Sequence, residues 1–330
     1  MSFSVAKKTL LRRLADGHFH SGQSLGDSLG ISRTAVWSLI QELQGLGLEV
    51  HSVRGKGYRL AHGFELLDVD SIREAMSTEA RQLLRVLEVH DELDSTNSHL
   101  MRLEAAQRSA GRVCLAECQT AGRGRIGRAW QSPFGGNVCL SMLWQFRDQS
   151  MIAGLSLAVG VAVARALRRI GVSGAGLKWP NDILWSGRKL GGILLEVSGE
   201  ANDVYNVVIG VGINGSLAGQ QTALIDQPWI DLREVMGLAA VPRNQLVASL
   251  LDELFRVLNG YESGGLARHI DEWRSYHCQH GQSVCLSQGD QAIAGVIAGV
   301  TDDGMLLLDT ENGGRRTFAS GDLRLRAAHD

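Results

Sequence analysis

The sequence predicts an α+β protein of three domains, because three stretches of the 330-residue chain follow three different patterns. Residues 1–65 show short helical periodicities followed by a hairpin pattern, which is the element order of a winged helix-turn-helix. Residues 66–278 alternate strand and helix patterns and predict a mixed α/β domain. Residues 279–330 contain short apolar runs separated by turns such as Asp-Asp-Gly and Asn-Gly-Gly, which predict a small β-barrel.

Three helices and two strands are expected within the first stretch. Leucines form the inner faces of two short helices, one around residues 10–14 and one around residues 25–29. Ser32 is a suitable N-cap for a third helix, in which Val36 and Ile40 face inward. The stretch LEVHSVRGKGYRL then predicts two strands around a Gly-Lys-Gly turn.

The second stretch is expected to contain six strands and three longer helices. The strand patterns cover residues 85–93, 111–119, 137–146, 176–185, 191–199 and 203–213. The helical patterns cover residues 96–108, 151–170 and 243–260.

Composition and charge place the chain among soluble globular proteins with one basic region. Hydrophobic residues make up 44% of the chain, enough for a sizeable core. The net charge of -2 argues against a generally basic nucleic-acid coat, yet residues 1–62 carry eight Lys or Arg against four Asp or Glu, a local charge of +4. Five cysteines without C-x-x-C pairing are expected to be reduced thiols of a cytoplasmic protein, and no apolar run has the length of a membrane span.

The stretch TAGRGRIGRAW, residues 120–130, has the glycine spacing G-x-G-x-x-G without its usual context. A dinucleotide-binding loop of that pattern opens a helix, whereas Pro133 and two glycines follow this one. The alternative is a flexible loop in which glycine allows close approach to a ligand, and Arg123, Arg125 and Arg128 offer planar donors to phosphate oxygens. A solvated surface loop would have the same composition.

Two further stretches carry groups that suit a phosphorylated ligand. KWPNDILW places Lys178, Asn181 and Asp182 where a strand meets a turn, because Pro180 blocks ordinary sheet pairing. Lys189 lies in GRKLGGILLE, whose paired glycines permit close approach of a ligand. Lys, Asn and Asp in such a setting can hold a phosphate, a base edge and a magnesium ion, although each lysine taken singly could be a solvated turn residue.

The stretch DSTNSHL predicts a polar helix start. Ser95, Thr96 and Asn97 can each act as an N-cap, and a start rich in hydroxyl groups can also bind a polar head group. The histidines and cysteine of HCQH, residues 277–280, fit no structural zinc spacing and are not expected to bind a metal.

These stretches occur together in the order and spacing of one family. DSTN, QTAGRGRIGRAW, SPFGGNV, KWPNDI, GRKLGGILLE and GVGIN resemble the biotin–protein ligases. With a winged helix in front and a β-barrel behind, the chain is similar to the bifunctional ligase–repressors of bacteria, and the resemblance covers nearly all of it. It implies a central domain of the class II synthetase-like type and an SH3-like C-terminal barrel.

The resemblance also implies the reaction and the partners. Biotin would react with ATP, with Mg²⁺ as cofactor, to give biotinyl-5′-AMP and pyrophosphate. A lysine of the biotin carboxyl carrier protein of acetyl-CoA carboxylase would then take the biotin. The adenylate would also act as corepressor, since the adenylate-bound homodimer would bind the operator DNA of biotin biosynthesis genes.

Matched motif by motif, the resemblance assigns roles to single residues. Catalytic roles are implied for Lys189, Arg125 and Lys178. The implied biotin-binding residues are Ser95, Thr96, Asn97, Gln119, Arg123, Gly124, Arg125 and Lys189. Those for ATP or the adenylate are Arg128, Lys178, Asn181, Asn214 and Trp229, with Asp182 near Mg²⁺. One departure is Ile126, which stands where relatives commonly carry another arginine.

The third helix and the hairpin turn are expected to contact DNA, because they carry exposed polar and basic groups within the basic region. The predicted DNA-contacting residues are Ser32, Arg33, Thr34, Trp37, Ser38, Arg54 and Lys56. A winged helix that docks on another protein is the alternative.

Two other functions remain open at this point. One is a lipoate- or octanoate-handling ligase with the same catalytic fold. The other is a pure transcription factor that senses biotin through an inactive ligase domain, against which the intact Arg125 and Lys189 argue.

We predict that Arg33→Ala weakens operator binding, by about 1–3 kcal/mol for a lost base or phosphate contact. Ligation should be unchanged, because the residue is expected on the outer face of the third helix and not among the groups implied for biotin and ATP. Gel shifts with operator DNA measure the first effect and carrier labelling the second. An unchanged affinity for the operator would remove Arg33 from the DNA-binding face.

Overall fold

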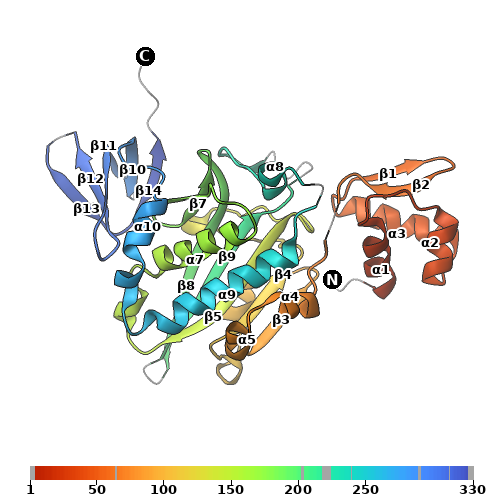
Figure 1. Ribbon diagram of the computed structural model, residues 1–330, viewed down its shortest axis with the longest axis horizontal. Helices are drawn as coiled ribbons and strands as arrows, with labels where there is room; N and C mark the ends of the chain where they lie inside the picture. The colour runs from red at the N-terminus through yellow and green to blue at the C-terminus, as the bar shows by residue number, and fades with distance from the viewer. Residues whose placement is uncertain are drawn as a thin grey trace, which may run out of the picture.

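The computed structural model describes three successive parts of the chain (Figure 1). A head of three helices and a hairpin lies at one end of the molecule, a seven-stranded sheet with helices lies in the middle, and a five-stranded sheet lies at the other end. No helix within the described ranges is long and apolar enough to cross a membrane. All five cysteines are free. The described residues are 4–63, 65–201, 204–217, 224–238, 240–288, 291–311 and 313–325.

The head has the predicted order of elements. Its core consists of the predicted apolar faces, since Val36 and Ile40 are both at most 1% exposed. Ser32 is the N-cap of the third helix, and its hydroxyl accepts a hydrogen bond from the Ala35 N–H at 3.2 Å. The elements are α1 (Val5–Leu14), α2 (Gly22–Leu29), α3 (Arg33–Gly45), β1 (Val50–Val53) and β2 (Gly57–Leu60).

The central sheet is mixed and almost entirely antiparallel. Its strand order is β3-β4-β5-β9-β8-β7-β6, and only the pair β3–β4 is parallel. The strands are β3 (Val86–His90), β4 (Arg112–Ala116), β5 (Asn137–Phe146), β6 (Gly176–Lys178), β7 (Asp182–Trp185), β8 (Arg188–Ala201) and β9 (Val204–Asn214).

The prediction of a single strand over residues 176–185 is wrong. The chain reverses at Trp179-Pro180, so that β6 and β7 form a tight antiparallel hairpin in which Lys178 pairs with Asp182. The physical reason is that Pro180 has no N–H to donate to a sheet neighbour. The reversal brings the polar residues of KWPND to the end of the sheet.

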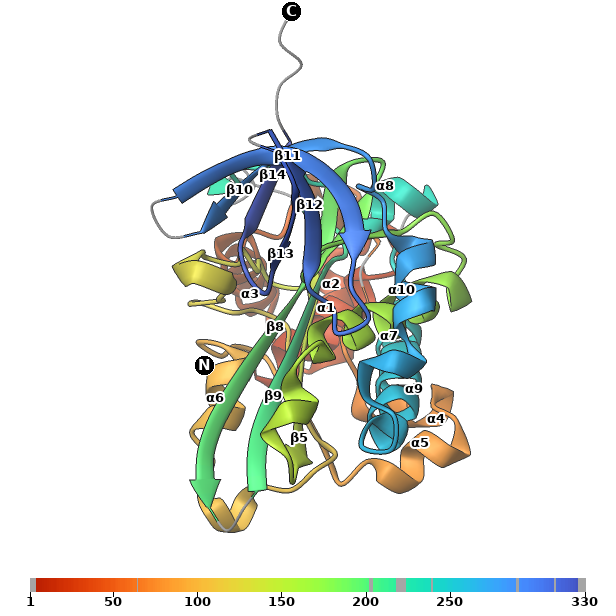
Figure 2. The same ribbon diagram turned by 90° about the vertical axis from the view of Figure 1, so that its left-hand side faces the viewer.

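Helices cover both faces of this sheet (Figure 2). The helix α6 lies on one face, and α7 and α9 lie on the other. The predicted helix over 96–108 is too long, because α6 ends at Met101 and a separate 3-10 turn follows. Four short helices were not expected. The helices are α4 (Val69–Ala75), α5 (Thr78–Leu83), α6 (Thr96–Met101), α7 (Leu155–Arg169), α8 (Leu232–Met236), α9 (Arg243–Tyr261) and α10 (Ile270–Tyr276).

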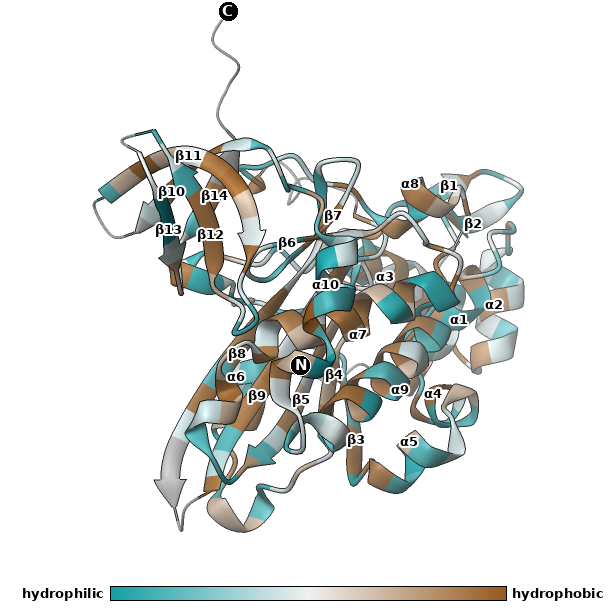
Figure 3. Ribbon diagram, turned by 60° about the vertical axis from the view of Figure 1, so that its left-hand side comes forward, coloured by the Kyte–Doolittle hydropathy of each residue, from teal (hydrophilic) through white to brown (hydrophobic). Residues whose placement is uncertain are grey.

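Alternation along the strands divides the core between the two faces. Val113 and Leu115 belong to the large apolar cluster under α7 and α9. Cys114, between them, belongs instead to a small cluster with Leu100 of α6. The hydropathy colouring in Figure 3 marks apolar residues along α7, and most of this helix is buried.

The C-terminal part is a sheet of five antiparallel strands in the order β13-β12-β11-β10-β14. It is attached to the central part by a buried contact, in which the Trp179 indole N–H donates to the Gly304 carbonyl at 3.0 Å. The strands are β10 (Ser283–Gln288), β11 (Gln291–Val300), β12 (Leu306–Thr310), β13 (Arg315–Phe318) and β14 (Asp322–Leu325).

A buried ion pair holds the segment that joins the head to the central sheet. Arg243 donates to Glu117 at 2.7 Å, and the two side chains are 3% and 2% exposed. Arg243 also donates to the Glu65 carbonyl, and the second Glu117 oxygen accepts from the Leu67 N–H at 2.6 Å. The pair therefore neutralises two buried charges and fixes the backbone between residues 65 and 67.

We predict that Arg243→Ala lowers stability by about 3–5 kcal/mol, because it leaves the Glu117 carboxylate buried without a countercharge. The readout is the urea midpoint followed by tryptophan fluorescence. The control is Arg315→Ala, whose exposed ion pair with Asp309 should leave the midpoint nearly unchanged. Equal midpoints for both variants would contradict this account of the joint.

Candidate functional site

The Arg-Gly loop folds back on itself and does not open a helix. Gly124 N–H donates to the Arg128 carbonyl at 2.7 Å, and Trp130 N–H donates to the Gly122 carbonyl at 2.9 Å. A single 3-10 turn, Arg125–Gly127, forms the tip. This geometry agrees with setting aside a dinucleotide-binding turn, which needs a helix N-terminus at the phosphate.

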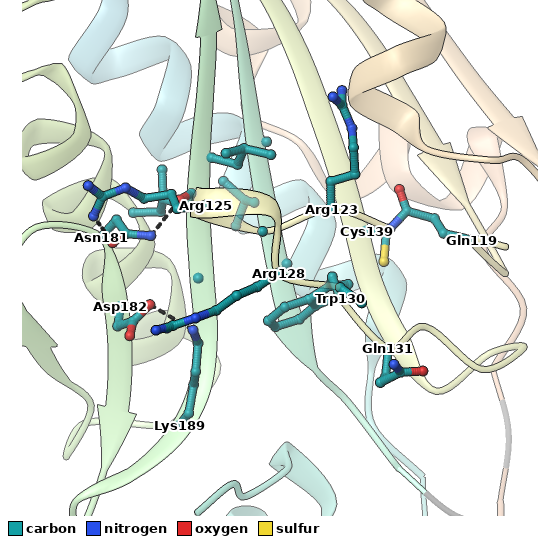
Figure 4. A pocket seen from close by; sticks show the side chains of 18 of the residues that line it. Gln119, Arg123, Arg125, Arg128, Trp130, Gln131, Cys139, Asn181, Asp182 and Lys189 are labelled. Atoms are coloured by element: carbon teal, nitrogen blue, oxygen red, sulfur yellow. Dashed lines mark hydrogen bonds and ion pairs between the residues drawn. The ribbon is translucent and has the colours of Figure 1, made fainter. Parts of the chain in front are cut away.

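A cavity of about 290 Å³ lies between this loop and the central sheet (Figure 4). One end is formed by the start of α6 with β5 and β9, and the other by β7, β8 and the segment before α8. Lys178 is the one predicted ligand residue that does not line it. The predicted residues that do are Ser95, Thr96, Asn97, Gln119, Arg123, Gly124, Arg125, Arg128, Asn181, Asp182, Lys189, Asn214 and Trp229.

The end of the cavity at α6 is neutral, polar and already hydrogen-bonded. Gln119 Oε1 accepts from the Thr96 N–H at 2.8 Å and from the Thr96 hydroxyl at 3.1 Å. The Ser141 hydroxyl donates to Asn97 Oδ1 at 2.5 Å and lies 2.7 Å from the Thr96 hydroxyl. Thr96 and Asn97 are each 4% exposed. Because these donors and acceptors restrain one another, they form a preorganised polar floor.

A clamp across α6 fixes the helix that carries this floor. Ser95 is the N-cap of α6, which confirms one of the three N-caps that the sequence allowed. Asp94 accepts two hydrogen bonds from Arg102, the C-cap residue, at 2.6 and 2.8 Å and one from the Ser95 N–H at 2.7 Å. The bonds from Arg102 lower the pKa of Asp94 to about 2, so the clamp is ionised at neutral pH.

The opposite end of the cavity gathers cations. Lys189 Nζ lies 2.8 Å from Asp182 Oδ1, and Lys178 Nζ lies 3.8 Å from Asp182 Oδ2. Arg125 donates to Asn181 Oδ1 at 2.8 Å, as the dashed line in Figure 4 marks. Burial lowers the pKa of Lys178, and the charge of Lys189 lowers it further against the opposing effect of Asp182. Such crowded, partly buried cations favour an incoming anion.

Each remaining arginine of the loop is held by a carboxylate from a distant element. Arg123 donates to Glu196 of β8 at 2.8 Å, and the same Glu196 oxygen accepts from Asn97 at 2.9 Å. Arg128 forms an ion pair with Asp322 at the start of β14, and this hydrogen bond raises the pKa of Arg128. The loop is therefore tied both to the polar floor and to the C-terminal sheet.

Comparison with known proteins assigns the chain to a family. The model for the biotin/lipoate A/B protein ligase family matches residues 89–214, an HTH domain matches residues 7–59, and the biotin protein ligase C-terminal domain matches residues 280–326. The bifunctional ligase/repressor BirA of Salmonella typhimurium is 40% identical over 99% of this chain and 100% of its own length. That of Escherichia coli is 38% identical over 97% of each chain.

The chain belongs to the biotin protein ligase family, among its bifunctional ligase/repressors.

A solved biotin protein ligase supports the same assignment for the central and C-terminal parts. The enzyme of Aquifex aeolicus in complex with biotin and ATP superposes with a TM-score of 0.64 at 28% identity, over 74% of this chain and 100% of that one.

Several residues at this candidate site escaped prediction from the sequence. Ser141 could have been suspected, because it is the single hydroxyl within the apolar run of β5. The glycines of GVGIN also carried a signal: a Cβ at Gly210 would lie 2.3 Å from Asn97 Oδ1, and one at Gly212 would lie 2.8 Å from the Trp130 ring. Glu196 ends the motif GRKLGGILLE, but nothing in the sequence pointed to its partner Arg123, 73 residues away, and Asp322 carried no signal, since its partner Arg128 is 194 residues away.

Asn214 and Trp229 both line the cavity, but their side chains have different contacts. Both amide hydrogens of Asn214 are already used, by the carbonyls of Lys189 at 3.1 Å and Ile230 at 3.0 Å. Trp229 forms a β-bridge with Lys189. Asn214 therefore fixes the backbone next to Lys189, while the Trp229 side chain is half-buried at the cavity wall.

The predicted DNA-contacting residues are all exposed on the head. Trp37 is 53% exposed, although it is a large aromatic side chain in the middle of α3. The other six, Ser32, Arg33, Thr34, Ser38, Arg54 and Lys56, are exposed as well. Not all basic residues of the head belong to this set, since Lys8 pairs with Asp91 and Arg12 with Asp68 of the central part.

We predict that Gly210→Ala weakens biotin binding about tenfold or more, because the new methyl group displaces Asn97 from the polar floor and leaves its partners unpaired. Isothermal titration calorimetry with biotin measures the effect. In an Asn97→Ala background the same substitution should cost little, since the clash is then absent. Additive losses in the double variant would show that Gly210 acts by another route.

Proposed function

We propose that the protein joins biotin and ATP to biotinyl-5′-AMP and transfers the biotin to a lysine of the biotin carboxyl carrier protein of acetyl-CoA carboxylase. The observation that carries this proposal is the division of one cavity into a neutral polar floor and a cationic end under the same loop. A ligand with a neutral polar head, an apolar chain and an activated phosphate at the other end matches that division.

The polar floor is proposed to receive the ureido ring of biotin. Thr96, Asn97 and Gln119 offer both donors and acceptors there, and the N-cap Ser95 lies beside them. Arg123 and Gly124 then face the valeryl chain as the loop passes over it. The network around Ser141 is already formed, so the ring would meet oriented partners without an added cost of ordering them.

The cationic end is proposed to bring two anions together. The carboxylate of biotin attacks the α-phosphorus of ATP, a P–O bond forms, and the bond to pyrophosphate breaks. Lys189 and Arg125 are the groups placed to neutralise the charge that develops on the phosphoryl oxygens, with Lys178 behind them. In the second step the amine of the carrier lysine attacks the acyl carbon, and AMP leaves.

The nucleotide is proposed to lie along Arg128, Asn181 and the segment at Trp229, whose ring can stack on adenine. Asn214 would support this end through the backbone of Lys189. Mg²⁺ would enter with the triphosphate and neutralise its charge. Asp182 is the carboxylate beside both lysines, and one carboxylate with phosphate oxygens is a usual ligand set for Mg²⁺.

The head is proposed to bind the operator of biotin biosynthesis genes as part of an adenylate-bound homodimer. Its exposed surface carries Arg33 on α3 and Arg54 and Lys56 at the hairpin turn, which suits a helix in the major groove and a wing on the phosphates. Biotinyl-5′-AMP would be the corepressor, so that the level of the metabolite sets repression.

The finer description of the fold is part of the same proposal. We divide the chain into a winged helix at 1–65, a class II synthetase-like ligase domain at 66–278 and an SH3-like barrel at 279–330. We propose a cytoplasmic localisation, which the free cysteines support.

We predict that Lys189→Ala lowers carrier labelling about 100-fold or more, the loss typical of removing one group that stabilises transition-state charge. The control is Arg188→Ala, which changes the preceding residue of the same strand, one that forms an exposed ion pair with Glu234. Purified protein is incubated with biotin, ATP and Mg²⁺, and bound biotinyl-5′-AMP and labelled carrier are measured by mass spectrometry.

The same assay separates the rival functions. The wild-type protein should accumulate the adenylate with biotin and not with lipoate. Biotin binding without any adenylate would indicate a sensor with an inactive ligase domain, and lipoyl-adenylate would indicate a lipoate ligase. Full labelling by Lys189→Ala would overturn the role given to that lysine.

A further inference from the structure

Four potential metal ligands from three segments converge on the face of the sheet that α6 covers. Glu88 and His90 lie on β3, His99 lies on α6, and Cys114 lies on β4. One ligand atom from each side chain lies within 4.8 Å of all the others. Among the described residues this is the group in which three or more such side chains meet so closely.

The spacing of the two imidazoles from the carboxylate is close to that around a tetrahedral ion. His99 Nε2 lies 3.1 Å from Glu88 Oε2, and His90 Nε2 lies 3.6 Å from the same oxygen. Ligand bonds of about 2.1 Å at a tetrahedral zinc ion place neighbouring ligand atoms about 3.4 Å apart. These two distances agree with that value, and the group as a whole lies within 4.8 Å.

The cluster also contains an unmet polar atom. His90 Nε2 is buried and has no hydrogen-bond partner. Its neighbour Glu88 Oε2, 3.6 Å away, is beyond hydrogen-bond distance, and a buried ring nitrogen without a hydrogen bond costs free energy unless something else binds it. The neighbouring His99 ring does not meet this need, because the two rings contact each other side by side at 4.8 Å between centroids and a tilt of 56°.

Charge and access suit a cation that enters from solvent. Arg112 pairs with the other oxygen of Glu88, Oε1, and so leaves Oε2 directed at the two histidines. The side chains of Glu88, His90 and His99 are 24%, 33% and 26% exposed, whereas Cys114 is completely buried. The carboxylate and imidazoles thus form an accessible rim above a thiol at the bottom.

We propose that Glu88, His90, His99 and Cys114 bind a divalent transition-metal ion, for which Zn²⁺ is the best match. One sulfur, two imidazole nitrogens and one carboxylate oxygen form a set of borderline-soft donors, which zinc binds tetrahedrally and which calcium and magnesium do not prefer.

An ion at this place would brace the helix that carries the polar floor of the cavity. His99 lies on the same six-residue helix as Thr96 and Asn97, and the ion would join that helix to β3 and β4. Binding to the folded state alone raises stability with ion concentration. Zinc should therefore raise the melting temperature of the wild-type protein.

The first test is zinc binding by the full-length protein after removal of bound metal with a chelator. Competition with a chromogenic chelator should show one tight site per chain in the wild type. The double variant His90→Ala/His99→Ala should bind at least about 100-fold more weakly, since two of four ligands are gone. The matched control is His18→Ala/His20→Ala, which removes two histidines beside Asp16 in the head.

Equal zinc affinity in the two double variants would overturn the proposal, as would the absence of a tight site in the wild type. Circular dichroism shows whether each variant is folded.

The second test reads the ligand set directly and uses the wild-type fold. Cobalt(II) in this site should give the intense visible bands of a tetrahedral ion and a thiolate-to-cobalt charge-transfer band. Cys114→Ser should remove the charge-transfer band, while Cys278→Ser, at a cysteine outside the cluster, should keep it. Weak octahedral bands, or a charge-transfer band that survives Cys114→Ser, would contradict the site.

Discussion

Four cationic side chains converge on one cavity, and the arrangement of the site depends on the protein groups that pair with each of them in the absence of a ligand. Arg123 is held by Glu196, Arg128 by Asp322 and Lys189 by Asp182, while Arg125 is held by the neutral amide of Asn181. The three carboxylates lie on different elements, so the positive charges bind the loop, the sheet and the C-terminal strands together. A neutral amide holds a guanidinium less strongly than a carboxylate does, so an anionic ligand displaces it most easily. Arg125 is therefore the first of these groups that can turn toward a phosphate.

The same contacts connect the ligand site to the rest of the chain. Glu196 contacts both Arg123 and Asn97, so the Arg-Gly loop and the polar floor share a side chain. Phe134, four residues beyond Trp130, belongs to the apolar cluster of the head. The buried pair of Glu117 and Arg243 holds the segment between head and sheet. The chain that follows the loop is therefore packed against the head through Phe134.

The sequence was sufficient to predict features that are determined by neighbouring residues. The cap at Ser32, the inner face of α3 and the failure of the Arg-Gly loop to open a helix all follow from neighbouring residues. It failed where the outcome depends on distant partners. The reversal between β6 and β7 depends on how these strands pair within the sheet, which the local sequence does not specify. Glu196 and Asp322 contact the loop only in the folded chain, because they are distant from it in sequence. The cluster around His90 has no ligand spacing along the chain, because its members come from three segments.

The central claim is that one cavity binds the ureido ring of biotin at its neutral floor and the activated phosphate at its cationic end. Calorimetry on Arg125→Gln with two ligands tests it most directly: biotin, and a non-hydrolysable analogue of biotinyl-5′-AMP. The account predicts that the analogue loses affinity tenfold or more, about the value of one hydrogen bond to a charged group, while biotin loses much less. Equal losses for the two ligands would contradict the division of the cavity.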